Sequence, residues 1–107
     1  MRAAFFAAIV LAAVVATARP AAAVVRCGTI SVRDYGVSQP VVYRVRIVKG
    51  RVSCRTARRV LTFFVAKDVS PRGWFCVRGH ASQNQSWAAG CGTRAGAIVR
   101  AYGPVRK

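Results

Sequence analysis

Nucleophilic hydrolysis needs a nucleophile, a base and a group that orients the base, and the chain contains one set of the right residue types. The set is Asp68, His80 and either Ser82 or Ser86. No nucleophile-elbow glycine pattern surrounds either serine, and the histidine and serines fall in a polar stretch where solvated residues are common. We therefore predict that the protein is not an enzyme, and we keep a small secreted hydrolase as a distant alternative.

Paired carboxylates would support a different hydrolytic chemistry, but the chain has only two acidic residues, Asp34 and Asp68. Asp34 is expected to end a strand and Asp68 to end a helix, and nothing in the pattern brings them together. We predict no catalytic residue and no cofactor.

Four cysteines offer either a metal site or two disulfides. They are Cys27, Cys54, Cys76 and Cys91, with no C-x-x-C pair, and His80 is the one histidine of the chain. Zinc sites use closely spaced Cys and His ligands, whereas an even cysteine count in a secreted domain indicates disulfides. We predict two disulfides and no metal.

The places that the cysteines are expected to occupy in the fold favour the disulfides Cys27–Cys54 and Cys76–Cys91. If the first two strands form a hairpin, Cys27 lies near the residues that lead into the helix at Cys54. A second hairpin places Cys91 opposite Cys76. The rival pairing, Cys54–Cys76 with Cys27–Cys91, stays open, because four cysteines allow three connectivities.

Residues 1–23 have the pattern of a removable signal peptide. Met1-Arg2 is positive, residues 3–18 are an apolar run, and Ala21-Ala22-Ala23 supplies the small residues that a signal peptidase requires. The alternative is a membrane anchor, but about 16 apolar residues are fewer than the roughly 20 that span a bilayer. We expect a secreted protein with one domain over residues 24–107, located outside the cell or in the cell envelope.

The charge is strongly positive: 18 Lys and Arg against two acids give a net charge of +16. Removal of 1–23 takes away Arg2 and Arg19 and leaves +14. A coding sequence of high GC content accounts for the excess of arginine over lysine. It does not account for the presence of only two acidic residues. We expect a monomer whose partner is anionic: a cell-wall polymer, an anionic lipid, a nucleic acid or an acidic protein.

The candidate anion-binding residues come from two segments. Arg44 and Arg46 share one face of a predicted strand, and three helical arginines lie within one turn, near a helix N-terminus that disfavours cations. The alternative is that the basic residues form a dispersed solvated coat. The candidates are Arg44, Arg46, Arg55, Arg58 and Arg59, and the wider set adds Arg51, Arg72 and Arg78.

Aromatic residues provide a second possible binding feature. Trp74, Trp87, Tyr43 and Tyr102 could form a stacking platform beside arginines, although small cores also depend on aromatic residues, and we favour that structural role. Phe75 and Val77 alternate with Trp74 and Cys76, so one apolar face of this strand is expected to be open to a partner.

Periodicity predicts the elements that must position these residues. A helix is predicted over 53–67, with Ser53 as its N-cap. Its apolar stripe consists of Cys54, Ala57, Val60/Leu61 and Phe64. Strands are predicted over 29–34, 41–49, 73–78, 86–91 and 97–102. The order strand-strand-helix-strand-strand-strand indicates an α+β fold, with a mainly antiparallel five-stranded sheet and one helix packed across it.

The frame also resembles a group of proteins. The chain resembles small secreted cysteine-containing actinobacterial proteins of unknown function. The motifs that carry this resemblance are Cys27-Gly28, Tyr43-x-Val45, 52–60 (V-S-C-x-x-A-R-x-V), Gly73-Trp74-x-Cys76 and Cys91. The resemblance implies secretion, disulfides and this element order, and it implies no catalytic residue. We predict a non-enzymatic binding module for an anionic partner. The alternative is a membrane-active cationic protein of antimicrobial or toxin type.

Overall fold

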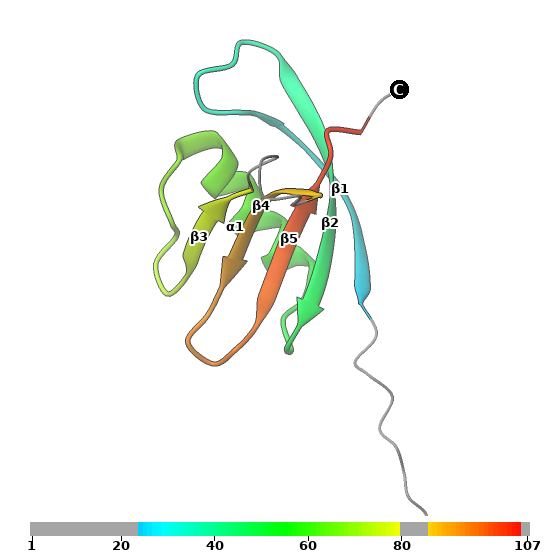
Figure 1. Ribbon diagram of the computed structural model, residues 1–107, viewed down its shortest axis with the longest axis vertical. Helices are drawn as coiled ribbons and strands as arrows, with labels where there is room; N and C mark the ends of the chain where they lie inside the picture. Colours follow the sequence, from blue (N-terminus) through cyan, green and yellow to red (C-terminus); the bar gives the residue numbers. More distant parts are fainter. Residues whose placement is uncertain (1–23, 80–85, 106–107) are drawn as a thin grey trace, which may run out of the picture.

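A 14-residue helix lies across one face of an antiparallel sheet in the computed structural model, which describes residues 24–79 and 86–105 (Figure 1). The strand order is β1-β2-β5-β4-β3, so β5 lies between two strands that precede it in the chain. The α+β fold is as predicted. The predicted signal peptide, residues 1–23, lies outside the described residues. The elements are β1 (Val25–Arg33), β2 (Pro40–Lys49), α1 (Cys54–Lys67), β3 (Phe75–Arg78), β4 (Trp87–Gly92) and β5 (Ile98–Tyr102).

Helix α1 begins and ends at the signals that its sequence carries. The Ser53 hydroxyl accepts a hydrogen bond from the Thr56 backbone N–H at 3.0 Å, which satisfies one free first-turn donor. At the other end Asp68 adopts the left-handed conformation, and its N–H donates to the Phe64 carbonyl at 2.7 Å. The buried stripe is Ala57, Val60, Leu61, Phe64 and Val65.

The core lies between this stripe and one face of the sheet. Tyr43, Val45 and Ile47 alternate along β2 and are all buried, with Val99 of β5 and Ala89 of β4 beside them. Burying an aliphatic side chain of this size contributes on the order of 1.5–3 kcal/mol. Because strand side chains alternate, the same register places the arginines of β2 on the opposite, helix-free face of the sheet.

All five strands differ from their predicted ranges at one or both ends, and two of them begin two or more residues away from the predicted start. Strand β1 begins at Val25 rather than Thr29, because pairing with β2 continues past a bulge between Arg26 and Thr29. Gly28 lies within that bulge at a φ of +79°, which a glycine adopts without a steric cost. Strand β3 begins at Phe75 rather than Gly73, because the Trp74 N–H donates to the Pro71 carbonyl in a turn.

Both predicted disulfides are confirmed. Cys27–Cys54 joins β1 to the start of α1, with Cα atoms 5.0 Å apart. Cys76–Cys91 joins β3 to β4 at directly opposed positions, with Cα atoms 4.0 Å apart. The rival pairing is excluded.

Candidate anion-binding face

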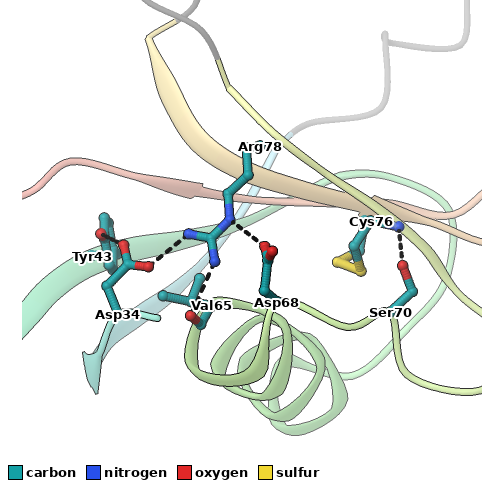
Figure 2. Close-up of polar contacts among 8 residues, drawn as sticks. Asp34, Tyr43, Val65, Asp68, Ser70, Cys76 and Arg78 are labelled. Atoms are coloured by element: carbon teal, nitrogen blue, oxygen red, sulfur yellow. Dashed lines mark hydrogen bonds and ion pairs between the residues drawn. A yellow bond between two sulfur atoms is a disulfide. The ribbon is translucent and has the colours of Figure 1, made fainter. Parts of the chain in front are cut away.

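The two acidic side chains of the sequence meet at one arginine (Figure 2). Arg78, at the end of β3, points between the sheet and α1. Its Nη1 donates to Asp34 Oδ1 at 2.8 Å and its Nε donates to Asp68 Oδ1 at 3.1 Å. Nη2 donates to the Val65 carbonyl at 3.2 Å, and the guanidinium lies 5.0 Å from the centre of the Phe64 ring. Arg78 therefore ties β3 to the end of β1 and to the end of α1.

Tyr43 extends this network, because its hydroxyl donates to Asp34 Oδ2 at 2.9 Å. Burial raises the pKa of Tyr43 to about 12, and the hydrogen bond and charge of Asp34 act in the same direction. Burial lowers the pKa of Arg78, but its hydrogen bonds and ion pairs with Asp34 and Asp68 outweigh burial and raise it. The phenol and the guanidinium are thus held in their protonated forms.

Since both carboxylates bind Arg78, the other arginines in the described ranges have no carboxylate partner. Three of these arginines form a row across the helix-free face of the sheet. Arg46 of β2 lies directly opposite Arg26 of β1 on one side and Arg100 of β5 on the other. Arg44, two residues before Arg46 on the same face, lies opposite Thr29 and Tyr102. Like charges directly opposite each other in a sheet repel, so this row is electrostatically unfavourable in the absence of an anion.

Two members of this row, Arg46 and Arg100, each stack their guanidinium group on an aromatic ring. The Arg46 guanidinium lies 4.8 Å from the centre of the Tyr102 ring, and that of Arg100 lies 5.1 Å from the Trp87 ring. Gly90 leaves room for this second stack, because a Cβ there would lie 3.3 Å from the Trp87 ring. Such stacking orients a guanidinium while its charge and N–H donors stay available to a ligand.

The β1 bulge hollows the same face. A depression of about 490 Å³ lies between β1 and β2, and Arg26, Arg44 and Arg46 line it together with Gly28 and Thr29. Three arginine side chains therefore line one concave site. We define Arg26, Arg44, Arg46 and Arg100, with Trp87 and Tyr102, as the arginine face.

The five candidate residues from the sequence lie on two surfaces. Arg44 and Arg46 belong to the arginine face. Arg55, Arg58 and Arg59 lie on α1, on the other side of the sheet, and Arg58 Nη1 donates to the Cys27 carbonyl at 2.9 Å. The structure does not bring the two groups together. Of the wider set, Arg78 is in the ion-pair network, and Arg51 and Arg72 are exposed at other positions.

The four aromatic residues considered for a stacking platform, for which a structural role was favoured, also divide between two locations. Tyr43 is buried, with 5% of its surface exposed, and Trp74 packs against the core. Trp87 and Tyr102 are half-buried on the arginine face. Phe75 and Val77 of β3 are 75% and 58% exposed, as expected for the open side of that strand.

Sequence reasoning missed Arg26 and Arg100. Arg26 falls before the predicted start of the first strand. Arg100 was within a predicted strand, but it becomes a neighbour of Arg46 only because β5 pairs with β2. The available signal was the alternation of Ile98, Arg100 and Tyr102, which places all three on one strand face.

The residues considered for catalysis and metal binding are in an ion pair, in disulfides or at an exposed position, or lie outside the described residues. Asp68 binds Arg78, and Ser86 is exposed just before β4. His80 and Ser82 lie outside the described residues. All four cysteines are in disulfides, and within residues 24–79 and 86–105 no three His, Cys, Asp or Glu side chains form a metal-binding group.

In the part of the chain that the structure describes, no helix has the length and apolar character needed to cross a membrane. The two disulfides are consistent with an oxidising, extracytoplasmic environment. Comparison with known proteins found no matching family model, no matching curated protein and no matching solved structure.

Proposed function

We propose that the protein is a secreted, non-enzymatic binding module whose arginine face holds an anionic polymer. The observation that carries this proposal is the row Arg26–Arg46–Arg100, in which three cations lie directly opposite one another on adjacent strands. Adjacent strands are about 4.8 Å apart, and alternate residues along a strand are separated by about 6.6 Å. The row and Arg44 thus form a two-dimensional array of donors that a chain of negative groups can contact at several points.

The arrangement favours a polymer over a single small anion. A small anion could occupy the depression beside Arg26, Arg44 and Arg46, but it would leave Arg100, on the far side of β2, without a partner. A polymer that crosses the strands contacts both regions. It also removes the repulsion along the row, so that binding stabilises the fold.

Salt dependence of binding tests the proposal. The probes are heparin and a 20-nucleotide oligo-dT, titrated against the protein from 20 to 300 mM NaCl. The logarithm of affinity should fall linearly with the logarithm of salt concentration, with a contribution of about 0.7 per phosphate contact on a single strand. The double variant Arg46→Gln/Arg100→Gln should bind at least tenfold more weakly at low salt, with a slope smaller by about 1.4 for the two lost contacts.

A matched control separates this face from net charge. Arg55→Gln/Arg72→Gln removes the same charge from exposed positions outside the arginine face. We expect its slope to stay close to that of the wild type. Equal losses in the two double variants would show that total charge, rather than this face, determines binding, and no binding of either probe at 20 mM NaCl would overturn the proposal.

A membrane-active protein is the second candidate function, and one observation favours it. Phe75 and Val77 present exposed apolar side chains on the same side of the sheet as the arginine face. Cationic and apolar groups on one surface suit an anionic bilayer, where the apolar groups enter the headgroup region. Release of dye from vesicles of phosphatidylglycerol, reduced in a Phe75→Ser variant, would support this function, whereas a binding module should leave the vesicles intact.

A further inference from the structure

A second surface lies at the edge of the sheet, on the helix side of β1. Strand β1 is an outermost strand, and α1 runs beside it. Between them is a groove of about 580 Å³. Residues 29–31 line it from the strand, and Arg58, Arg59, Phe63 and Lys67 are among the residues that line it from the helix. This groove shares only Thr29 with the depression on the arginine face.

The backbone of β1 is available along the groove. Because β1 pairs only with β2 among the described strands, alternate N–H and C=O groups on its outer side have no ladder partner. The strand has nine residues and contains no proline, and its bulge lies between Arg26 and Thr29, so residues 29–33 carry neither of these blocks to further pairing. An extended segment can therefore add to this edge as a further strand.

Contacts at both ends hold the groove open at a set width. At one end the Cys27–Cys54 disulfide joins β1 to α1, and Arg58 Nη1 donates to the Cys27 carbonyl at 2.9 Å. At the other end, just beyond β1, the Tyr35 N–H donates to the Val65 carbonyl at 3.0 Å. The groove is thus formed before any ligand arrives, which lowers the ordering cost of binding.

The side chains of α1 select the charge of the ligand. Arg58, Arg59 and Lys67 are three cations along the helix side of the groove, and both acidic side chains, Asp34 and Asp68, bind Arg78 instead. Phe63, 42% exposed, adds one apolar contact among them. A strand in the groove would point alternate side chains at the helix, so acidic side chains in alternation, with one bulky apolar side chain, complement it.

We infer that the β1–α1 groove binds an extended acidic segment of a partner protein by strand addition to β1. A second copy of this chain is a poorer occupant, because full antiparallel pairing of two β1 strands would bring Arg26 of each copy near Arg33 of the other. A nucleic acid lacks the peptide N–H and C=O groups that an open strand edge accepts.

The test uses the full chain and a capped eight-residue peptide of alternating Glu and Thr with one central Leu. Two further peptides of the same sequence carry backbone N-methyl groups at alternate residues, one at the odd-numbered and the other at the even-numbered positions. N-methylation removes the main-chain donors and leaves the side chains, so at least one of these two peptides should bind tenfold or more weakly by calorimetry. Amide hydrogen exchange should slow in 29–33 when the unmodified peptide is bound.

Two double variants distinguish this site from the arginine face. Arg59→Gln/Lys67→Gln should lose peptide affinity by at least tenfold, whereas Arg46→Gln/Arg100→Gln should keep it within about twofold. Equal binding of methylated and unmethylated peptides, or no protection in 29–33, would overturn strand addition. A dimer of the free protein in sedimentation that the peptide fails to dissociate would also overturn the inference, because the edge would then be occupied by a second copy.

Discussion

Arg46 lies directly opposite Arg100 across the β2–β5 pair, on the face of the sheet that α1 does not cover. Arg26 extends the same row on the other side of Arg46. Within the described residues neither Arg46 nor Arg100 has a carboxylate partner; instead each guanidinium stacks on an aromatic ring. The fold therefore tolerates a repulsive row that an anion would relieve.

Salt should stabilise the protein through this row. Screening of cross-strand repulsion of this kind is worth about 0.5 kcal/mol, or roughly 2–4 °C in Tm for a domain of this size. We expect Tm to rise between 20 and 200 mM NaCl, and to rise less in Arg46→Gln than in the exposed control Arg72→Gln. Calorimetry or circular dichroism measures it, and an identical salt dependence in the two variants would contradict the prediction.

Arg78 should be the most important arginine for stability. Its guanidinium binds Asp34, Asp68 and the Val65 carbonyl, and its removal leaves the partly buried Asp34 without its ion pair. Arg78→Gln should lower the free energy of unfolding by about 2 kcal/mol, whereas Arg72→Gln should change it by less than about 0.5 kcal/mol. Urea unfolding gives both values.

The conservative replacement Arg78→Lys tests the geometry of the same contact. A lysine keeps the charge, but it cannot place three donors in the planar arrangement that reaches Asp34, Asp68 and the Val65 carbonyl together. We expect Arg78→Lys to recover less than half of the lost stability. Full recovery would mean that charge alone accounts for the role of Arg78.

Alkaline pH should destabilise the fold through Tyr43. Its pKa is raised to about 12 in the folded protein, against about 10 in an unfolded chain, so the folded state retains the phenol proton more strongly. This contribution to stability is complete below pH 10 and is lost as pH rises from 10 to 12. In Tyr43→Phe the decline over this range should be shallower. Urea unfolding at several pH values checks it, and parallel curves for the two proteins would contradict the prediction.

The two disulfides should differ in their contribution to stability. Each should contribute on the order of 2–4 kcal/mol. Cys27–Cys54 spans 27 residues and Cys76–Cys91 spans 15, so in the chain-entropy account the first contributes about 0.5 kcal/mol more. Unfolding of the double variants Cys27→Ser/Cys54→Ser and Cys76→Ser/Cys91→Ser measures this difference. A larger loss from the second pair would show that native-state contacts, rather than loop length, dominate.

Much of the local structure follows from local pattern. Ser53, the apolar stripe of α1 and the alternation of Tyr43, Val45 and Ile47 are features of single elements, and each is found as predicted. The disulfide pairing was favoured but not fixed by the sequence, because two predicted hairpins bring Cys27 near the start of the helix and Cys91 opposite Cys76, while four cysteines allow three connectivities. The open apolar side of β3 followed from the alternation of Phe75 and Val77.

The binding surfaces depend on contacts between distant segments. Arg78 and Asp34 are 44 residues apart in the sequence. That both acidic side chains pair with this one arginine, and with no other in the described ranges, could therefore not be predicted from the local sequence around either residue.

The sequence by itself determined the elements, their buried faces and the excess of positive charge, because these depend on residue type and short-range periodicity. The tertiary structure alone decided where that charge is concentrated. Insertion of β5 between β2 and β4 brings Arg100 opposite Arg46, and the sheet separates both from Arg58 and Arg59 on α1. Strand order arises from the packing of the whole sheet against α1, and no local pattern in a single strand specifies its neighbour.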